Sequence, residues 1–262
     1  MDGPGFGPGL DRLIDASLEE DLGLGDVTTR ATVPPDAEGA ATVVAKEHVV
    51  LAGVEVFRRV FDRLDQDLRV DAASHDGDEL DAGATVATLE GRLVSILEGE
   101  RVALNFLGRL SGIATLTRRF VDAIPEGSRT AIVDTRKTTP GLRALERHAV
   151  RMGGGRSHRA RLDGGLLIKD NHIAACGSVT EAIRRARAHE GPALRVEVEV
   201  KDLDELELAL SAGAEVVMLD NMPLQEIRRA MDNARGRALV EVSGRVSIAA
   251  VPALAELEVD FL

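Results

Sequence analysis

Hydrophobic and polar positions follow different patterns on the two sides of residue 92 in this 262-residue chain. Before it, apolar residues at helical spacing predict helices around Leu10–Leu18 and in "VFRRVFDRL", whereas "ATVVAKEHVVLAG" alternates as short strands do. In "DGDELDAGATVATLEG", Asp and Gly recur between short apolar stretches, which predicts β-turns between short strands. This part of the sequence predicts a small α+β, sandwich-like domain.

From Leu93 to about Ile124 the apolar residues stay at helical spacing, with an interruption near Ser111 and Gly112. The pattern predicts two consecutive helices that lead into a second domain. We therefore expect an α+β domain with a bridging helix over residues 1–110 and an α/β domain over residues 111–262.

After the bridging segment, a unit made of an apolar run, a polar turn and an amphipathic helix recurs. The strand candidates are "TAIVDT", "GLLIKD", "LRVEVEV", "EVVMLD", "ALVEVSG" and a final "VDFL". Continuous Val, Ile and Leu runs that alternate with helices indicate a parallel sheet covered by helices. No Gly-rich dinucleotide-binding motif accompanies them, which favours a barrel over an open sheet.

Polar or reactive residues follow five of these strands. They are Asp134–Lys137, Lys169–His172, Glu199, Asp220–Asn221 and Ser243–Gly244. Since the catalytic residues of α/β barrels lie at the carboxyl ends of the strands, we expect these side chains to converge. Arg and Lys suit phosphates and carboxylates, and Glu199 and Asp220 would hold ribose hydroxyls or a metal. His172 would either take part in the site or cap the following helix.

The charge balance narrows the class of ligand. Asp and Glu number 44 against 32 Lys and Arg, for a net charge of -12, which excludes a nucleic-acid binder by bulk charge. Between Arg129 and Lys169, however, the sequence has ten basic residues and only three acidic ones, and the stretch "DTRKTTPGLR" is part of this basic region. A basic region in an acidic chain indicates a small polyanionic ligand.

Composition also bears on the environment of the protein. The single Cys176 cannot form an internal disulfide, no apolar run approaches the length of a membrane span, and the first residues lack a signal-peptide pattern. We expect a cytoplasmic protein without a membrane partner. Only four basic residues are Lys, and acids are abundant, so a salt-adapted (halophilic) host is a hypothesis; GC-rich coding could also favour Arg over Lys.

The longer motifs resemble the quinolinate phosphoribosyltransferase family, the carboxylating nicotinate-nucleotide pyrophosphorylases of NAD synthesis. The resemblance covers nearly the whole chain and rests on "EDLGLGDVTT", "GERVALNFLGRLSGIAT", "DTRKTTPGLR", "GGGRSHRARLDGGLLIKDNHI", "VEVEV", "VVMLDNM" and "EVSG". It implies an incomplete TIM-like α/β barrel of the type II phosphoribosyltransferase kind. It also implies that quinolinate and 5-phosphoribosyl-1-pyrophosphate (PRPP) react to nicotinate mononucleotide, pyrophosphate and CO2, with Mg²⁺ and no redox cofactor.

The resemblance further implies roles for particular residues. Lys137, Lys169, Glu199 and Asp220 would be catalytic, and Glu199 and Asp220 would also face the ribose and its magnesium. Arg101 would reach the site from the partner subunit of a homodimer, with a higher oligomer as the alternative assembly. The complete substrate-binding set implied is Arg101, Thr135, Arg136, Lys137, His158, Arg159, Lys169, Glu199, Asp220, Ser243, Gly244 and Arg245.

The chain departs from the family pattern at two places. Arg245 stands where the family usually has a second Gly, and it would either bind the 5-phosphate or obstruct it. The chain stops at "VDFL", so we expect the barrel to be truncated at its last strand and the following loop to be missing. Two alternatives to the active enzyme are a ModD-like phosphoribosyltransferase relative with another substrate and an inactive truncated homologue.

Overall fold

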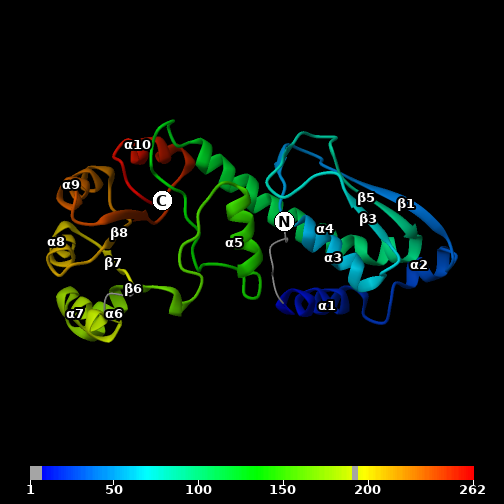
Figure 1. The fold of residues 1–262 in the computed structure, drawn as a ribbon, viewed down its shortest axis with the longest axis horizontal. Coiled ribbons are helices and arrows are strands. Elements are labelled where there is room, and N and C mark those ends of the chain that lie inside the picture. Colours follow the sequence, from blue (N-terminus) through cyan, green and yellow to red (C-terminus); the bar gives the residue numbers. More distant parts are fainter. Residues whose placement is uncertain (1–7, 191–193) are drawn as a thin grey trace. The chain divides into compact units, whose positions relative to one another are not determined.

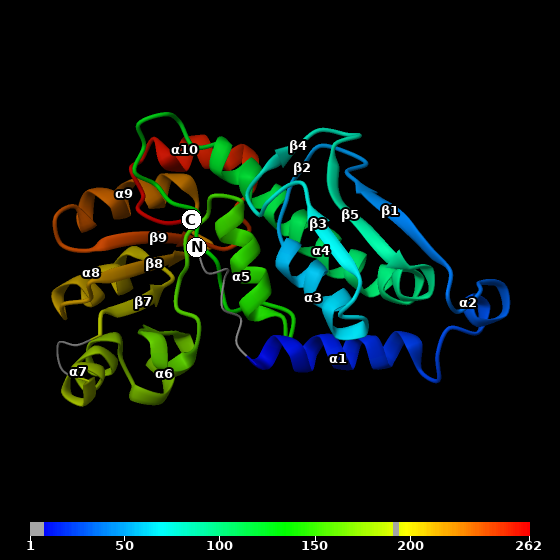
Figure 2. The same cartoon turned by 45° about the vertical axis from the view of Figure 1, so that its right-hand side comes forward.

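The computed structural model describes residues 8–190 and 194–262 (Figures 1 and 2). Its contacts divide the chain into two compact units. The first unit comprises Met1–Arg118 and Lys137–Gly154, and the second unit comprises Arg119–Arg136 and Gly155–Leu262. The segment Lys137–Gly154 belongs to the first unit because Leu145 and Ala149 of its helix α5 (Arg143–Met152) are buried in that unit's core.

The first unit is an α+β structure, as the sequence predicts. Its three-stranded antiparallel sheet has the order β1 (Glu38–Val44), β5 (Thr85–Arg92), β3 (Arg69–Ala72), and β2 (Val49–Val50) pairs with β4 (Glu79–Leu80). Besides α5, its helices are α1 (Pro8–Leu22), α2 (Val27–Thr32), α3 (Val54–Leu64) and α4 (Leu93–Asp122), of which α4 ends within the second unit. The amphipathic α3 buries Phe57 and Phe61, whose rings pack edge to face.

Helix α4 corrects one expectation: it is a single helix of 30 residues, not two helices separated near Ser111 and Gly112. The Ser111 hydroxyl accepts a hydrogen bond from Ala52 N (3.1 Å) and donates one to Ala52 O (3.2 Å), so its polar group is satisfied outside the helix. A helical Gly costs only about 1 kcal/mol relative to Ala, which burial of a neighbour such as Leu110 offsets.

The second unit is built on four parallel strands in the order β6 (Leu166–Ile168), β7 (Val196–Val200), β8 (Val216–Asp220), β9 (Leu239–Ser243). Figure 2 shows α7, α8 and α9 along one side of these strands. The helical elements are η1 (Leu162–Gly164), α6 (Asp170–Cys176), α7 (Val179–Glu190), α8 (Leu203–Ser211), α9 (Leu224–Ala234), η2 (Ile248–Ala250) and α10 (Val251–Ala255).

The last residues of the chain complete a further strand position. Phe261 pairs in parallel with both Ala131 and Glu241, and Val133 pairs with Arg156. The residues "VDFL" therefore lie between β9 and the residues around Ala131. Among the described residues no pairing joins Arg156 to β6, so the strand pairing is interrupted there.

None of the helices in the described ranges combines the length and apolar character needed to cross a membrane.

Candidate active site

The strands of the second unit have one apolar face and one polar face. Val196, Val198 and Val200 of β7 are buried in the hydrophobic core that the helices cover. Because side chains alternate along a strand, Glu197 and Glu199 lie on the opposite face of β7. Met218 of β8 pairs in register with Glu199 on one side and with Glu241 of β9 on the other, which brings these acids onto the same face.

His158 links two of the acids. Its Nε2 lies 2.8 Å from Glu197 Oε2 and 3.6 Å from Glu241 Oε2, and its backbone N donates to Asp134 Oδ1 at 2.9 Å. The Glu197 and Glu241 side chains are only 9% and 8% exposed. The hydrogen bond to Glu197 is the main reason that the pKa of His158 is raised. Burial, followed by the charge of Glu197, raises the pKa of Glu241 to about 7.

Lys169 lies directly after β6, where the sequence places it. Its Nζ forms an ion pair with Glu199, the inward-facing acid of the neighbouring strand. The backbone N of Lys169 donates to His172 Nδ1 at 2.9 Å, and His172 thereby caps the start of α6. Of the two readings of His172, the structure supports the helix cap.

Arg159 is held next to the backbone of the η1 region, where its Nη1 donates to Gly165 O at 2.9 Å. Burial, and then the charge of Arg136, lower the pKa of Arg159. Because the charge of Arg136 disfavours the charged form of Arg159, an anion bound beside Arg159 would be favoured. The predicted pair Arg136 and Arg159 is therefore brought together in the second unit.

The ends of β8 and β9 form a tight turn region. Asp220 pairs in register with Ser243, and Asn221 N donates to Ser243 O at 3.0 Å. Gly244 has a φ of +90°, and a Cβ there would come within 2.3 Å of Asn221 Oδ1, so this position requires glycine. Arg245 also has a positive φ, of 37°, and is exposed.

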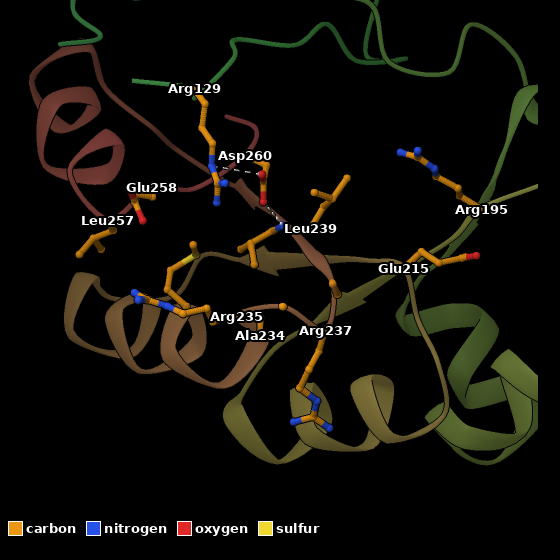
Figure 3. A pocket seen from close by; sticks show the side chains of 14 residues that line it. Arg129, Arg195, Glu215, Ala234, Arg235, Arg237, Leu239, Leu257, Glu258 and Asp260 are labelled. Atoms are coloured by element: carbon orange, nitrogen blue, oxygen red, sulfur yellow. Dashed lines mark hydrogen bonds and ion pairs between the residues drawn. The ribbon is translucent and has the colours of Figure 1, made fainter. Parts of the chain in front are cut away.

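Two cavities of the second unit lie at opposite ends of its strands. One of about 370 Å³ adjoins the carboxyl ends of β7 and β8, where Glu199, Asp220 and Asp170 line it. The other, about 680 Å³, lies at the amino ends, where Arg129, Arg235 and other residues line it (Figure 3). The predicted site residue Thr135 is exposed and directly precedes Arg136 in the chain.

Arg101 and Lys137 belong to the first unit, and both are exposed. Arg101 lies on α4, and Lys137 begins the "KTTPGLR" segment. The segment is ordered by Glu146 of α5, whose Oε2 accepts a hydrogen bond from Thr139 N at 3.1 Å and whose carboxylate pairs with Arg109.

Glu197 and Glu241 were not among the residues singled out from the sequence. The signal was present, because a Glu between buried valines in "VEVEV" and "LVEVS" must face away from the helices. Their pairing with His158 could not be read from the sequence, since it depends on strand order and register.

Parallel strands around an acidic interior, with Arg136, Arg159 and Lys169 beside it, define an α/β-barrel protein whose site suits a small anion. Family models agree with this description: the quinolinate phosphoribosyl transferase C-terminal domain matches residues 113–262 and the N-terminal domain matches residues 26–111. The chain belongs to the quinolinate phosphoribosyl transferase family.

Individual relatives support the assignment along nearly the whole chain. A probable nicotinate-nucleotide pyrophosphorylase [carboxylating] of Bacillus subtilis is 40% identical over 97% of this chain and 87% of its own length. The nicotinate-nucleotide pyrophosphorylase [carboxylating] of Mycobacterium leprae is 42% identical over 95% and 89%. The crystal structure of NadC from Streptococcus pyogenes is 41% identical and superposes with a TM-score of 0.92, covering 100% of this chain and 91% of that one.

Proposed function

We propose that the protein joins quinolinate to PRPP and forms nicotinate mononucleotide, pyrophosphate and CO2 in de novo NAD biosynthesis. The relatives named above carry the carboxylating nicotinate-nucleotide pyrophosphorylase name, which supports the reaction. The observation that carries the proposal in this chain is the set of cations Arg136, Arg159 and Lys169 beside the partly exposed carboxylates of Glu199 and Asp220.

In the proposed reaction, Arg136, His158, Arg159 and Lys169 bind the two quinolinate carboxylates and orient the pyridine nitrogen. Arg is suited to this task because its planar fork can bind a carboxylate with two hydrogen bonds. Orientation of two bound anions removes much of the entropy cost of a bimolecular reaction.

The ring nitrogen attacks ribose C1 while the bond from C1 to pyrophosphate breaks. Positive charge grows on the ribose, which the carboxylates of Glu199 and Asp220 stabilise, and negative charge grows on the pyrophosphate, which Lys137 stabilises. The bond from C2 to its carboxylate then breaks and CO2 leaves. The electron pair stays on C2, next to the quaternised nitrogen, until C2 takes up a proton.

Glu199 and Asp220 are also suited to hold Mg²⁺ together with PRPP. Both acids end neighbouring strands and line the same cavity of about 370 Å³, and carboxylate oxygens are the ligands that Mg²⁺ prefers. When bound, Mg²⁺ would neutralise charge on the leaving pyrophosphate. Thr135, Ser243, Gly244 and the exposed Arg245 complete the proposed substrate-binding set.

The proposed assembly is a homodimer in which Arg101 of the partner subunit completes each site. Arg101 is exposed on α4, and a two-fold dimer lets each chain give this residue to the other. No nucleic acid or membrane takes part in the proposed reaction, which runs in the cytoplasm.

The direct test is product formation from quinolinate labelled in its 2-carboxylate, with PRPP and Mg²⁺, at low and high salt. We expect labelled CO2 and nicotinate mononucleotide in equal amounts, and no product when nicotinate replaces quinolinate. A folded protein that consumes PRPP with another aromatic acid but not with quinolinate would instead be a relative with a different substrate. Activity and stability that do not change with salt would reject the salt-adapted host.

A further inference from the structure

Two oxygens of the interior acids lack the partners that burial normally demands. Glu197 Oε1 and Glu241 Oε2 are buried and have no hydrogen-bond partner among the described residues. The two residues are only 7% and 6% exposed. A buried polar atom without a hydrogen bond is costly, and Glu241 Oε2 lies 3.6 Å from His158 Nε2, so a proton or a cation at this acid pair would be stabilising.

Burial and the neighbouring groups together oppose the ionisation of Glu241. Burial is the largest effect on its pKa and the charge of Glu197 on β7 is the next, while His158 and Lys169 act in the other direction. The charge of Arg159 disfavours the charged form of His158, and Asp134 Oδ1 accepts a hydrogen bond from the His158 backbone N. With its pKa raised to about 7, Glu241 gains or loses its proton within the physiological range.

A proton suits this position better than a metal ion. One donor atom from each of His158, Glu197 and Glu241 lies within 4.8 Å of the others, which would admit a cation. However, Lys169 and Arg159 act on the same cluster, and like charges at short range disfavour a dication. A proton on the Glu241 carboxyl group adds only one charge to the cluster.

We propose that Glu241 takes up a proton when a dianionic substrate binds, and that this residue thereby tunes the site for a dicarboxylate. The inference rests on the proposed function, because quinolinate supplies the dianion. With Glu241 protonated, Glu197 and His158 balance each other and the cluster is neutral. With Glu241 ionised, the cluster carries one negative charge, which offsets one of the cations that bind the substrate.

Linkage makes the coupling reciprocal. If the proton on Glu241 strengthens quinolinate binding, bound quinolinate must strengthen proton binding by the same factor. Couplings of this kind are typically on the order of tenfold, which corresponds to a shift of about one pH unit in the titration of Glu241.

The test is a carbon-13 NMR titration of protein labelled at glutamate Cδ, with and without saturating quinolinate. The Glu241 signal is identified by its absence from Glu241→Gln, or from Glu241→Asp if the first variant does not fold. We expect a midpoint near neutral pH in the free protein and a rise of about one unit with quinolinate. The matched control, Glu256→Gln, removes an exposed acid and should show the same shift as the unchanged protein.

Binding isotherms in two buffers of different ionisation enthalpy give a second measurement. The unchanged protein should take up protons with quinolinate near pH 8, and Glu241→Gln should take up clearly fewer. Quinolinate binding without a shift of the Glu241 midpoint overturns the inference and leaves the proposed function standing. If quinolinate does not bind, both the inference about Glu241 and the proposed function are overturned, and the product assay would then show no nicotinate mononucleotide. A Glu241 signal that moves with Zn²⁺ or Mg²⁺ alone identifies a metal site and also overturns the inference.

Discussion

The amino end and the interior of the barrel in the second unit both contain basic and acidic residues, but these residues differ in burial and in how they are paired. At the amino ends, Arg129 and Arg235 are 68% and 74% exposed, and their ion pairs with nearby acids are long, at 3.8 and 4.0 Å. In the interior, Glu197 and Glu241 are buried and joined through His158. The amino-end cavity is the larger of the two (Figure 3). Cavity size and the presence of arginines therefore do not distinguish the proposed site from the amino-end cavity.

Burial makes the difference because water screens the exposed charges. An exposed ion pair contributes little to stability, whereas buried groups alter one another's protonation. Glu207 and Glu241 illustrate this. The hydrogen bond from Arg237 lowers the pKa of the exposed Glu207 to about 2, and burial raises that of Glu241 to about 7.

The largest expected effect comes from Asp220→Asn, which keeps the side-chain shape and removes its charge. Turnover should fall roughly 100-fold because charge stabilisation on the ribose side is lost, while the dissociation constant for quinolinate should change less than about threefold. Steady-state kinetics and quinolinate titration measure the two quantities. The control at the other end of the barrel, Glu258→Gln, should leave both unchanged. Equal losses of turnover and quinolinate binding in Asp220→Asn would show that the site is misplaced.

Arg136→Lys and Arg159→Lys test whether the interior cations bind by shape as well as by charge. Each variant keeps the positive charge and removes the planar fork, so quinolinate affinity should drop by roughly 10-fold or more. Arg235→Lys, at the amino end, should bind quinolinate as the unchanged protein does. Unaltered quinolinate kinetics in both interior variants would refute the carboxylate clamp.

Glu241→Gln and Glu207→Gln should have opposite effects on stability. The pKa of Glu241 is about 7 in the folded protein and 4.5 in the unfolded chain. The contribution of Glu241 to stability is therefore fully present below pH 4.5 and is lost as the pH rises through about 7. In urea unfolding, the free energy of unfolding of Glu241→Gln should rise relative to that of the unchanged protein by on the order of 2–3 kcal/mol between pH 4.5 and 8.

Glu207 has a lowered pKa, so its contribution is present above pH 4.5 and is lost as pH falls towards about 2. Glu207→Gln should therefore be slightly less stable than the unchanged protein at neutral pH, and the difference should vanish in acid. Parallel pH profiles for the two variants would contradict the contrast between the buried and the exposed acid.

The proposed dimer gives the smallest predicted signal. Arg101→Ala and Asp220→Asn proteins should each be nearly inactive, but random exchange should produce hybrids in which one site is intact. Activity should rise to about one quarter of the unchanged protein per site, because half of the dimers are hybrids and half of their sites are whole. Verified subunit exchange without recovery would show that Arg101 does not serve the other subunit.

The sequence predicted much of the barrel because each strand is a short apolar run between turn residues. β6 to β9 fall inside four of the predicted runs, and Ala131 and Phe261 carry the pairing of two more. The helix predicted to break at Ser111 continues, because a hydrogen bond to Ala52 and burial of the neighbouring residues outweigh local propensity.

By itself, the sequence determined the kinds of element, the two faces of each strand and the polar residues at strand ends. Only the tertiary structure decided which of these residues meet. Glu197 and Glu241 are more than 40 positions apart, and their contact with His158 depends on strand order, register and the depth of burial. Protonation follows from that burial and from the neighbouring charges, neither of which is a property of the local sequence.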